Sequence, residues 1–157
     1  MKKSYLWIVL LLMLIFPSAS VIIDHGYFNP NADIILLVGK WFVFWAVGIR
    51  LFTAGLKQAI NPAFTASEIF HLQSAETHVI VKELGYANIC MGALAILSLF
   101  IPGWRSAAAF TGGLYMGIAG VYHIFKKPEG ANEVIAMVSD LFILAVMSLY
   151  LWSSFVC

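Results

Sequence analysis

Charged side chains are scarce in this chain. Asp, Glu, Lys and Arg make up 11% of its 157 residues, whereas soluble domains carry about 25%. Hydrophobic residues reach 62%, and the mean hydropathy is +0.91. This composition excludes an ordinary soluble domain and predicts an integral membrane protein. The net charge is only +1 and no basic patch stands out, which excludes nucleic acid as a partner.

Cysteine is also rare. Cys90 and Cys157 form no CxxC motif, which excludes a disulfide framework and argues against a thiol redox enzyme. The chain lacks a Walker loop, a dinucleotide-binding fingerprint and a Ser-His-Asp order. The sequence therefore identifies no cofactor.

Long apolar blocks dominate what is present. A helix needs roughly 20 apolar residues to cross a bilayer, and five blocks approach or exceed that length. The predicted crossings are residues 5–23, 34–57, 78–101, 105–125 and 132–153. We therefore predict an all-α fold, a polytopic transmembrane helical bundle that forms one domain over residues 1–157.

The first block has the order of a secretory signal peptide. A basic start, a short apolar centre and small residues around Ser18 follow one another, and cleavage there would leave four crossings. The apolar run resumes at residues 21–23, however, which favours a retained helix kinked at Pro17. We expect the next segment, residues 24–33, to be a turn-rich loop.

A short interfacial helix is predicted between the second and third crossings. Asn61-Pro62 marks a break, and Thr65-x-x-Glu68 before apolar residues is typical of a capping box. We expect this helix over about residues 65–73, lying along the membrane surface.

The placement of basic residues predicts the orientation. With the N-terminus inside, the outer side keeps only Lys40 and Arg105. The inner ends carry Lys2, Lys3, Lys57, Lys82, Lys126 and Lys127. We therefore predict a multi-pass protein of the cell (inner) membrane, surrounded by membrane lipid, with a cytoplasmic N-terminus. Lys40 lies about 9 Å from its helix end and is expected to snorkel outward.

Three polar residues on three crossings reach similar depths. Arg50, Asn88 and Asp140 each lie about 9–12 Å from the inner ends of their helices. An unpaired ion at such depth costs on the order of 3 kcal/mol or more, so we expect Arg50 and Asp140 to form an ion pair inside the bundle.

Further polar residues lie nearer the inner ends. Glu133 shares a helical stripe with Asp140, while Glu83 and His123 lie at the inner mouth. The predicted ligand- or ion-binding residues are Arg50, Glu83, Asn88, His123, Glu133 and Asp140. The alternative is structural, with an ion pair that sets helix register and an Asn88 that bridges two backbones.

The histidines do not indicate a metal site. Glu68-x-x-His71 has the spacing of di-iron helical bundles, with His78 and His123 as further candidates. Such a site needs a second Glu-x-x-His and two more acids, and the second motif is missing. We therefore predict no metal centre.

Small residues on the fourth crossing permit close helix packing. Gly113-x-x-x-Gly117 is a close-approach motif, flanked by Ala109 and Gly120 at helical spacing. Packing within the chain is the favoured interpretation, and a homo-oligomer through the Gly113/Gly117 face is the alternative.

Four segments together resemble a prokaryotic family of small integral membrane proteins catalogued as a domain of unknown function. The resemblance covers about residues 40–147. The segments are GIRLFTAGLKQAINPAFTA, KELGYANICMG, GGLYMGIAGVYHIF and NEVIAMVSDLF. The resemblance implies a helical membrane bundle and supplies no activity. Its signature residues are Arg50, Gln58, Asn61, Pro62, Glu83, Asn88, His123 and Asp140.

A more limited resemblance concerns DoxX-type four-helix membrane proteins. Arg50 followed by Gly55 and Lys57 looks like their first helix. Some of those proteins are linked to quinone or thiol metabolism, which is an analogy of fold alone.

Three functions remain open. The favoured one is binding or transport of a small molecule, ion or proton through a polar pocket open to the cytoplasm. A structural or accessory subunit would use the polar residues as glue and the Gly113/Gly117 face for a partner. An enzyme acting on a lipid or quinone would use Glu83 or Asp140 as acid or base, with His123 as its partner.

Overall fold

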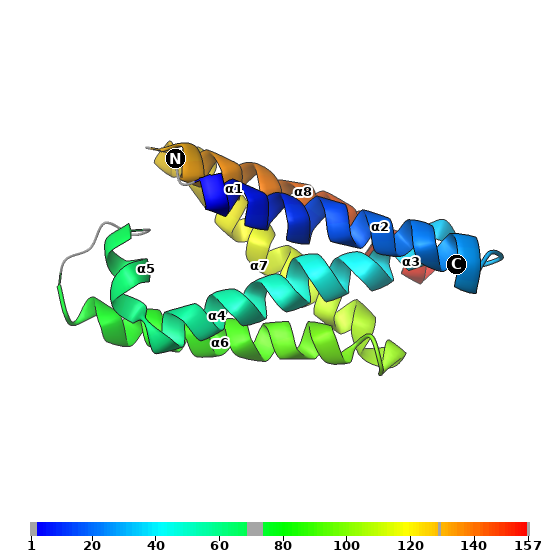
Figure 1. Cartoon of the computed structure of the whole chain (residues 1–157), viewed down its shortest axis with the longest axis horizontal. Helices are drawn as coiled ribbons and strands as arrows, with labels where there is room; N and C mark the ends of the chain where they lie inside the picture. The colour runs from blue at the N-terminus through cyan, green and yellow to red at the C-terminus, as the bar shows by residue number, and fades with distance from the viewer. Residues whose placement is uncertain (1–2, 69–73, 129, 157) are drawn as a thin grey trace.

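The computed structural model describes residues 3–68, 74–128 and 130–156, and the regular structure in these ranges is entirely helical. Five helical stretches are long and apolar enough to cross a membrane: Tyr5–Phe28, Ile34–Ile60, Thr77–Leu97, Pro102–Lys126 and Ala131–Val156. The predicted all-α bundle with five crossings is therefore confirmed, and Figure 1 shows its antiparallel arrangement.

The first crossing combines α1 (Lys3–Leu10), the π-helical η1 (Leu11–Ile15), α2 (Phe16–Ile23) and the π-helical η2 (Asp24–Phe28). Proline lacks the N–H that an α-helix requires in its interior. The π-helical turn before Pro17 changes the hydrogen-bond register, and the helix continues. It also extends to Phe28, so the prediction of a loop from residue 24 was wrong for its first half.

The second crossing is likewise interrupted by π-helix. It consists of α3 (Ile34–Phe42), η3 (Val43–Ile49) and α4 (Arg50–Ile60). Asp33 caps its start, because its carboxylate accepts from the backbone N–H groups of Ile35 and Leu36. Arg50 is thus the first residue after the π-helical segment.

The short helix α5 (Pro62–Glu68) begins three residues earlier than predicted. The side chain of Asn61 accepts a hydrogen bond from the backbone N–H of Phe64 at 3.3 Å. Asn61 is therefore the N-cap and proline takes the first helical position, where its missing N–H costs nothing. Thr65 is buried instead of capping. The rest of the predicted helix, residues 69–73, lies outside the described residues.

The remaining crossings agree with the predicted ranges to within a few residues. They are α6 (Thr77–Leu97), the 3-10 turn η4 (Pro102–Trp104), α7 (Arg105–Lys126) and α8 (Ala131–Val156). The largest difference is that α6 ends at Leu97, short of the predicted 101, because the chain turns through residues 98–100.

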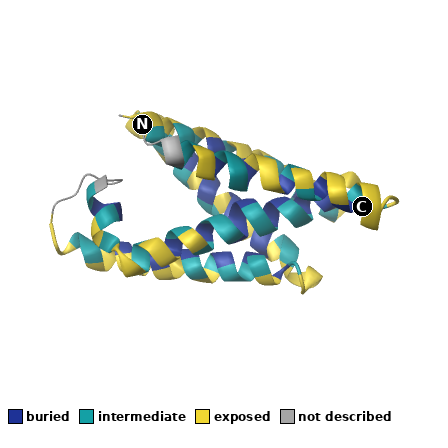
Figure 2. Ribbon diagram, in the orientation of Figure 1, coloured by how far each residue is buried: buried dark blue, intermediate teal, exposed yellow. Residues whose placement is uncertain are grey.

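The helices form two closely packed pairs. Helix α4 lies along α6, and α7 lies along α8, with α3 also on α8 and η3 on α6. Figure 1 shows the pairs crossing near the middle and separating toward the end that carries the N-terminus, hereafter the N-terminal end. Figure 2 shows the buried residues gathered around the crossing. This core includes Val43, Val47, Met116, Ile143 and Met147.

Glycines bring α4 and α6 into backbone contact. A Cβ atom added to Gly55 would lie 2.6 Å from the carbonyl oxygen of Gly85 and 2.8 Å from the nitrogen of Ile89. One added to Gly92 would lie 2.5 Å from the nitrogen of Phe52. Only glycine fits where two helix backbones approach this closely.

Helices α7 and α8 pack closely at Gly113 and Gly117, the glycines of the predicted close-approach motif. Met147 of α8 covers Gly113, and Leu144 covers Gly117. This packing within one chain accounts for the small residues without a second copy.

The first crossing is fixed to the second by a buried acid at the opposite end of the bundle. Lys40 Nζ lies 2.6 Å from one oxygen of Asp24, and Trp41 Nε1 donates to the same oxygen at 2.8 Å. Asn29 donates to the other oxygen at 2.7 Å. Lys40 is therefore held by Asp24, which differs from the prediction that it extends freely to the interface.

We predict that Gly55→Ala destabilises the bundle, because the new methyl group meets backbone atoms that cannot rotate away. Overpacking of this kind costs about 1–3 kcal/mol in unfolding free energy. Gly103→Ala is the matched control, since nothing lies within 4 Å of its Cβ position. The measurement is reversible unfolding in detergent, and equal stability of the two variants would contradict the close α4–α6 contact.

Candidate functional site

The predicted ion pair between the second and fifth crossings is present. Arg50 Nη1 lies 2.6 Å from Asp140 Oδ1, and the same nitrogen lies 3.6 Å from the sulfur of Met116. The side chain of Asp140 is 9% exposed and that of Arg50 is 17% exposed. Both side chains of the pair are therefore largely buried, and Arg50 is the more accessible of the two.

Local packing sets the position of Arg50. Val47, within η3, fills the notch left by Gly112 on α7. This contact brings the second crossing close to α7 one turn before Arg50. A helical side chain three residues further on lies on the same side, so the guanidinium passes α7 beside Met116 and reaches Asp140 on α8.

Asn88 contributes a polar group from α6. It is only 3% exposed, and its Nδ2 donates to Gln58 Oε1 on α4 at 2.8 Å. Its Oδ1 is buried and has no hydrogen-bond partner. Buried polar atoms are nearly always paired because an unmade hydrogen bond costs about 1–3 kcal/mol. This orphaned acceptor is therefore the most unusual atom of the site.

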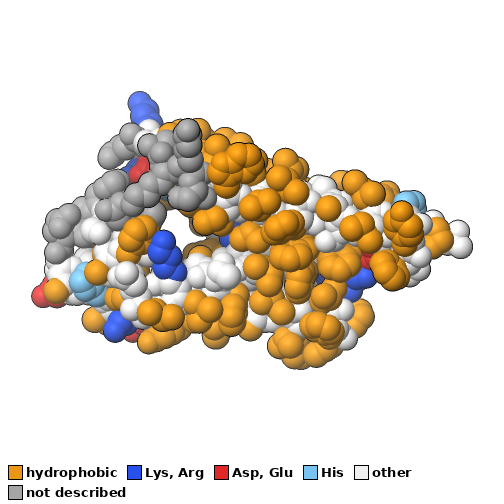
Figure 3. Space-filling view, viewed as in Figure 1, with side chains coloured by type: hydrophobic (Ala, Val, Ile, Leu, Met, Phe, Trp, Pro, Cys, Tyr) orange, Lys and Arg blue, Asp and Glu red, His pale blue; other side chains and the backbone are white. Residues whose placement is uncertain are grey.

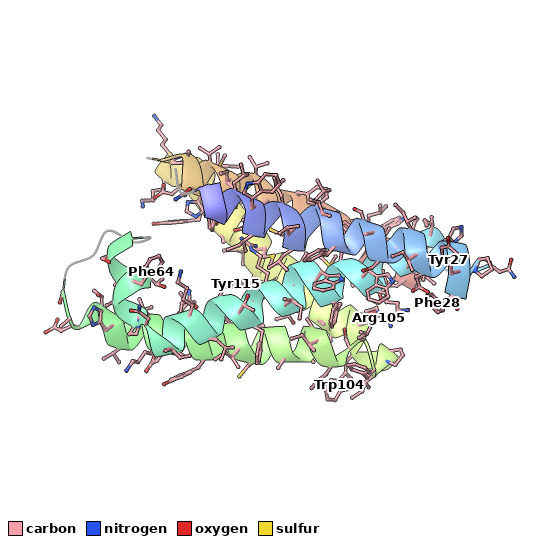
Figure 4. All side chains as sticks on the ribbon, viewed as in Figure 1. Tyr27, Phe28, Phe64, Trp104, Arg105 and Tyr115 are labelled. Atoms are coloured by element: carbon pink, nitrogen blue, oxygen red, sulfur yellow. The ribbon has the colours of Figure 1, made fainter. Side chains whose placement is uncertain are left out.

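Tyr115 adds a hydroxyl from α7. The side chain is half-buried, and its hydroxyl is within electrostatic reach of Asn88, Asp140 and Arg50. Figure 4 labels it near the crossing of the helix pairs. The cluster thus draws on four helices: Arg50 and Gln58 on α4, Asn88 on α6, Tyr115 and Met116 on α7, and Asp140 on α8.

Sequence reasoning missed Tyr115 as a site residue. A signal was available, because Tyr115 and His123 are eight residues apart and therefore share one face of α7. Gln58 was part of the family resemblance, but nothing in its spacing indicated the bond to Asn88, which depends on the crossing of α4 and α6.

The polar cluster lies where the helix pairs part. Beyond Arg50, α4 packs on α5 and α6 and hardly touches α7 or α8. Thr53 and Lys57, on the same stripe as Arg50, are exposed there. We call this opening the crevice. Figure 3 shows the surface hollowed here, with a Lys or Arg side chain beside the hollow.

The rim of the crevice includes α5. Lys57 Nζ lies 3.6 Å from the centre of the Phe64 ring, a cation–π contact that holds the amine at the N-terminal end. Figure 4 shows Phe64 on α5, across the opening from α7.

The other predicted site residues are placed less centrally. His123, in the last turn of α7, is half-buried, and its Nδ1 is buried without a hydrogen-bond partner. Glu133 is half-buried in the first turn of α8. Glu83 is exposed and points away from Asn88, because five residues of helix separate the two side chains by more than a quarter turn. The structure does not bring Glu83 into the cluster.

The site offers polar atoms but little metal chemistry. Within residues 3–68, 74–128 and 130–156, no group of three or more His, Cys, Asp or Glu side chains converges to hold a metal ion. Over the same residues, the ion pairs are Lys40–Asp24 and Arg50–Asp140, and neither includes His123.

The chain matches the model of a family of unknown function, DUF6790, over residues 3–155. It therefore belongs to that family, which confirms the resemblance to small membrane proteins catalogued as a domain of unknown function. The match gives no support to the DoxX-type resemblance. Neither curated proteins nor solved structures yield a match to this chain.

We predict that removing one partner of the ion pair is worse than removing both. Asp140→Leu leaves the Arg50 guanidinium without its counter-charge and should cost about 3 kcal/mol or more of unfolding free energy. Arg50→Met combined with Asp140→Leu should recover most of this loss, because neither charge then remains. Unfolding of single and double variants in detergent measures the coupling. Strictly additive losses would show that the pair contributes no interaction energy.

Proposed function

We propose that this member of a membrane-protein family of unknown function binds a small molecule or ion in the crevice and transports it across the membrane. The single observation that carries the proposal is the position of the Arg50–Asp140 pair, at the point where the two helix pairs separate. Ionisable groups inside a bundle commonly mark a substrate or ion path.

The incomplete hydrogen bonding of the cluster supports binding over structural service. A buried ion pair seldom stabilises a fold more than apolar residues of the same size. An ion pair that only sets helix register does not require unsatisfied polar groups near it. Here, however, Asn88 Oδ1 and His123 Nδ1 are buried without a hydrogen-bond partner. A bound molecule satisfies such atoms.

In this proposal, the position of each polar residue in the crevice determines its role. Arg50 and Asp140 form the floor of the crevice, and Asn88 and Tyr115 offer hydrogen-bonding groups beside it. His123 and Glu133 lie toward the mouth, where a solute enters. Glu83, being exposed, takes no part. We infer that the N-terminal end faces the cytoplasm, because most of the basic residues at helix ends lie there.

The two-pair architecture suits alternating access. Glycines let α4 pack closely on α6 and α7 on α8, and closely packed helix pairs can rock about a shared contact. The π-helical η3 lies at this contact, directly before Arg50. Such segments often mark functional sites within helices.

The accessory-subunit function is the second candidate, favoured by the close glycine packing of both pairs. An enzyme acting on a lipid or quinone finds less support, since the described residues place no carboxylate beside His123.

We predict that the crevice admits water. In a chain with Cys90 and Cys157 replaced by alanine, Thr53→Cys should react with a charged methanethiosulfonate added at the N-terminal end. Ile118→Cys is the control, because Ile118 is 63% exposed on the outer surface of α7, facing lipid. Only a thiolate in water reacts, so Thr53→Cys should be at least about tenfold faster. Equal and slow rates would mean that the crevice is sealed.

We predict that the reconstituted protein passes at least one solute of a defined panel, and that Asp140→Asn abolishes this flux. The panel contains protons, potassium, chloride, inorganic phosphate, glycerol and acetamide. The variant keeps the side-chain shape and removes the charge that holds Arg50 in place. Liposomes containing Lys82→Gln protein serve as the control, since Lys82 is exposed. Flux no greater than in empty liposomes for all six solutes would exclude transport.

A further inference from the structure

We propose that the transported molecule is electrically neutral and donates a hydrogen bond to Asn88 Oδ1, as a small hydroxyl or amide compound does. This inference rests on the proposed function and names the class of its substrate. It follows from the charge balance and the hydrogen-bond balance of the cluster.

The charge balance at the floor of the crevice is zero. Arg50 carries one positive charge and Asp140 one negative charge, and they are in direct contact at 2.6 Å. The groups added by Gln58, Asn88 and Tyr115 are neutral. An ionic solute would therefore leave water without meeting a net opposite charge, and such desolvation costs several kcal/mol per ion.

The nearest further charge on α4 does not change this balance. Lys57 lies seven residues beyond Arg50, about 10 Å along the helix. Its amine is already placed over the Phe64 ring, 3.6 Å from the ring centre. Lys57 thus acts at the rim of the crevice, away from the cluster at its floor.

The hydrogen-bond balance specifies a donor. A carboxamide has two donor hydrogens on nitrogen and two acceptor positions on oxygen. Asn88 donates from its nitrogen to Gln58 Oε1 at 2.8 Å. Its oxygen then points away from Gln58 and remains buried without a partner. A solute hydroxyl or N–H supplies the missing donor, whereas chloride and potassium have none to give, and phosphate is disfavoured by its charge.

Asn88 is buried deeply enough for this contact to select solutes. The residue is 3% exposed, so water competes poorly for its oxygen. A site that contains a buried acceptor discriminates strongly against solutes that cannot donate, because the acceptor is then left unpaired. The Tyr115 hydroxyl interacts with the Asn88 side chain, so the same solute can meet both groups.

The test uses proteoliposomes and neutral and ionic probes. Stopped-flow light scattering measures the entry of glycerol and acetamide, and ion-sensitive dyes measure potassium, chloride and phosphate. The unaltered protein should raise glycerol or acetamide permeability above that of empty liposomes and leave ion permeability unchanged. Asn88→Leu should lower the neutral flux by roughly five- to tenfold, the value of one hydrogen bond.

The matched control is Ser98→Ala on the same helix. Ser98 is a buried polar residue whose hydroxyl donates only to the backbone oxygen of Ala95, so its loss should leave flux unchanged. Tyr115→Phe is a second variant for the case in which Asn88→Leu does not fold. It removes only a hydroxyl and should also lower the neutral flux. Folding of each variant is checked by gel filtration.

The outcomes separate this inference from the function on which it rests. Ion flux without glycerol or acetamide flux would overturn the neutral class and leave transport standing. Neutral flux that is unaffected by Asn88→Leu, or by Tyr115→Phe where Asn88→Leu does not fold, would overturn the role of the orphaned acceptor. Absence of any flux would overturn both proposals.

Discussion

Two opposite charges on separate helices can remain inside an apolar bundle only if they meet, and the contact between Arg50 and Asp140 meets this condition. Apart from this contact, α4 hardly packs against α8. The ion pair therefore adds a specific electrostatic link between the helix pairs, beside the contacts of α3 with α8 and of Val47 with Gly112 that also join them. The helices meet at this level, and beyond it they separate toward the N-terminal end, which leaves the crevice.

Comparison of the two buried acids shows what distinguishes a structural ion pair from the proposed site. Asp24 accepts hydrogen bonds from Lys40, Trp41 and Asn29, so both of its oxygens are engaged. Its environment is complete, and it joins the first crossing to the second. Asp140 accepts from Arg50 through one oxygen, and the neighbouring Asn88 leaves an acceptor unused. Burial is similar at the two acids but hydrogen bonding is not, which is why we propose a binding role for the surroundings of Asp140 and a structural role for Asp24.

The parts of the structure that follow from a single helix could be predicted from the sequence. Length and hydropathy determine the five crossings, and depth from the helix ends placed Arg50 and Asp140 at a common level. The Asp24–Lys40 pair could not be found in this way, because residues 24–28 look like a loop and π-helix has no clear sequence pattern. The bond between Asn88 and Gln58 and the approach of Tyr115 depend on how helices cross, and periodicity within one helix does not contain this information.

The same crossing explains why the cluster is both buried and reachable. Gly55, Gly85 and Gly92 let α6 approach α4 so closely that Asn88 is almost completely buried between the helices. Among the described residues, α4 makes few contacts with α7 below Arg50, so that side of the cluster is less closely packed. A bundle selected only for stability would gain by closing this side with apolar residues, since closer packing adds van der Waals contacts between helices. An unsatisfied acceptor such as Asn88 Oδ1 forgoes that stabilisation, and in the proposed function a solute that completes its hydrogen bond restores part of it.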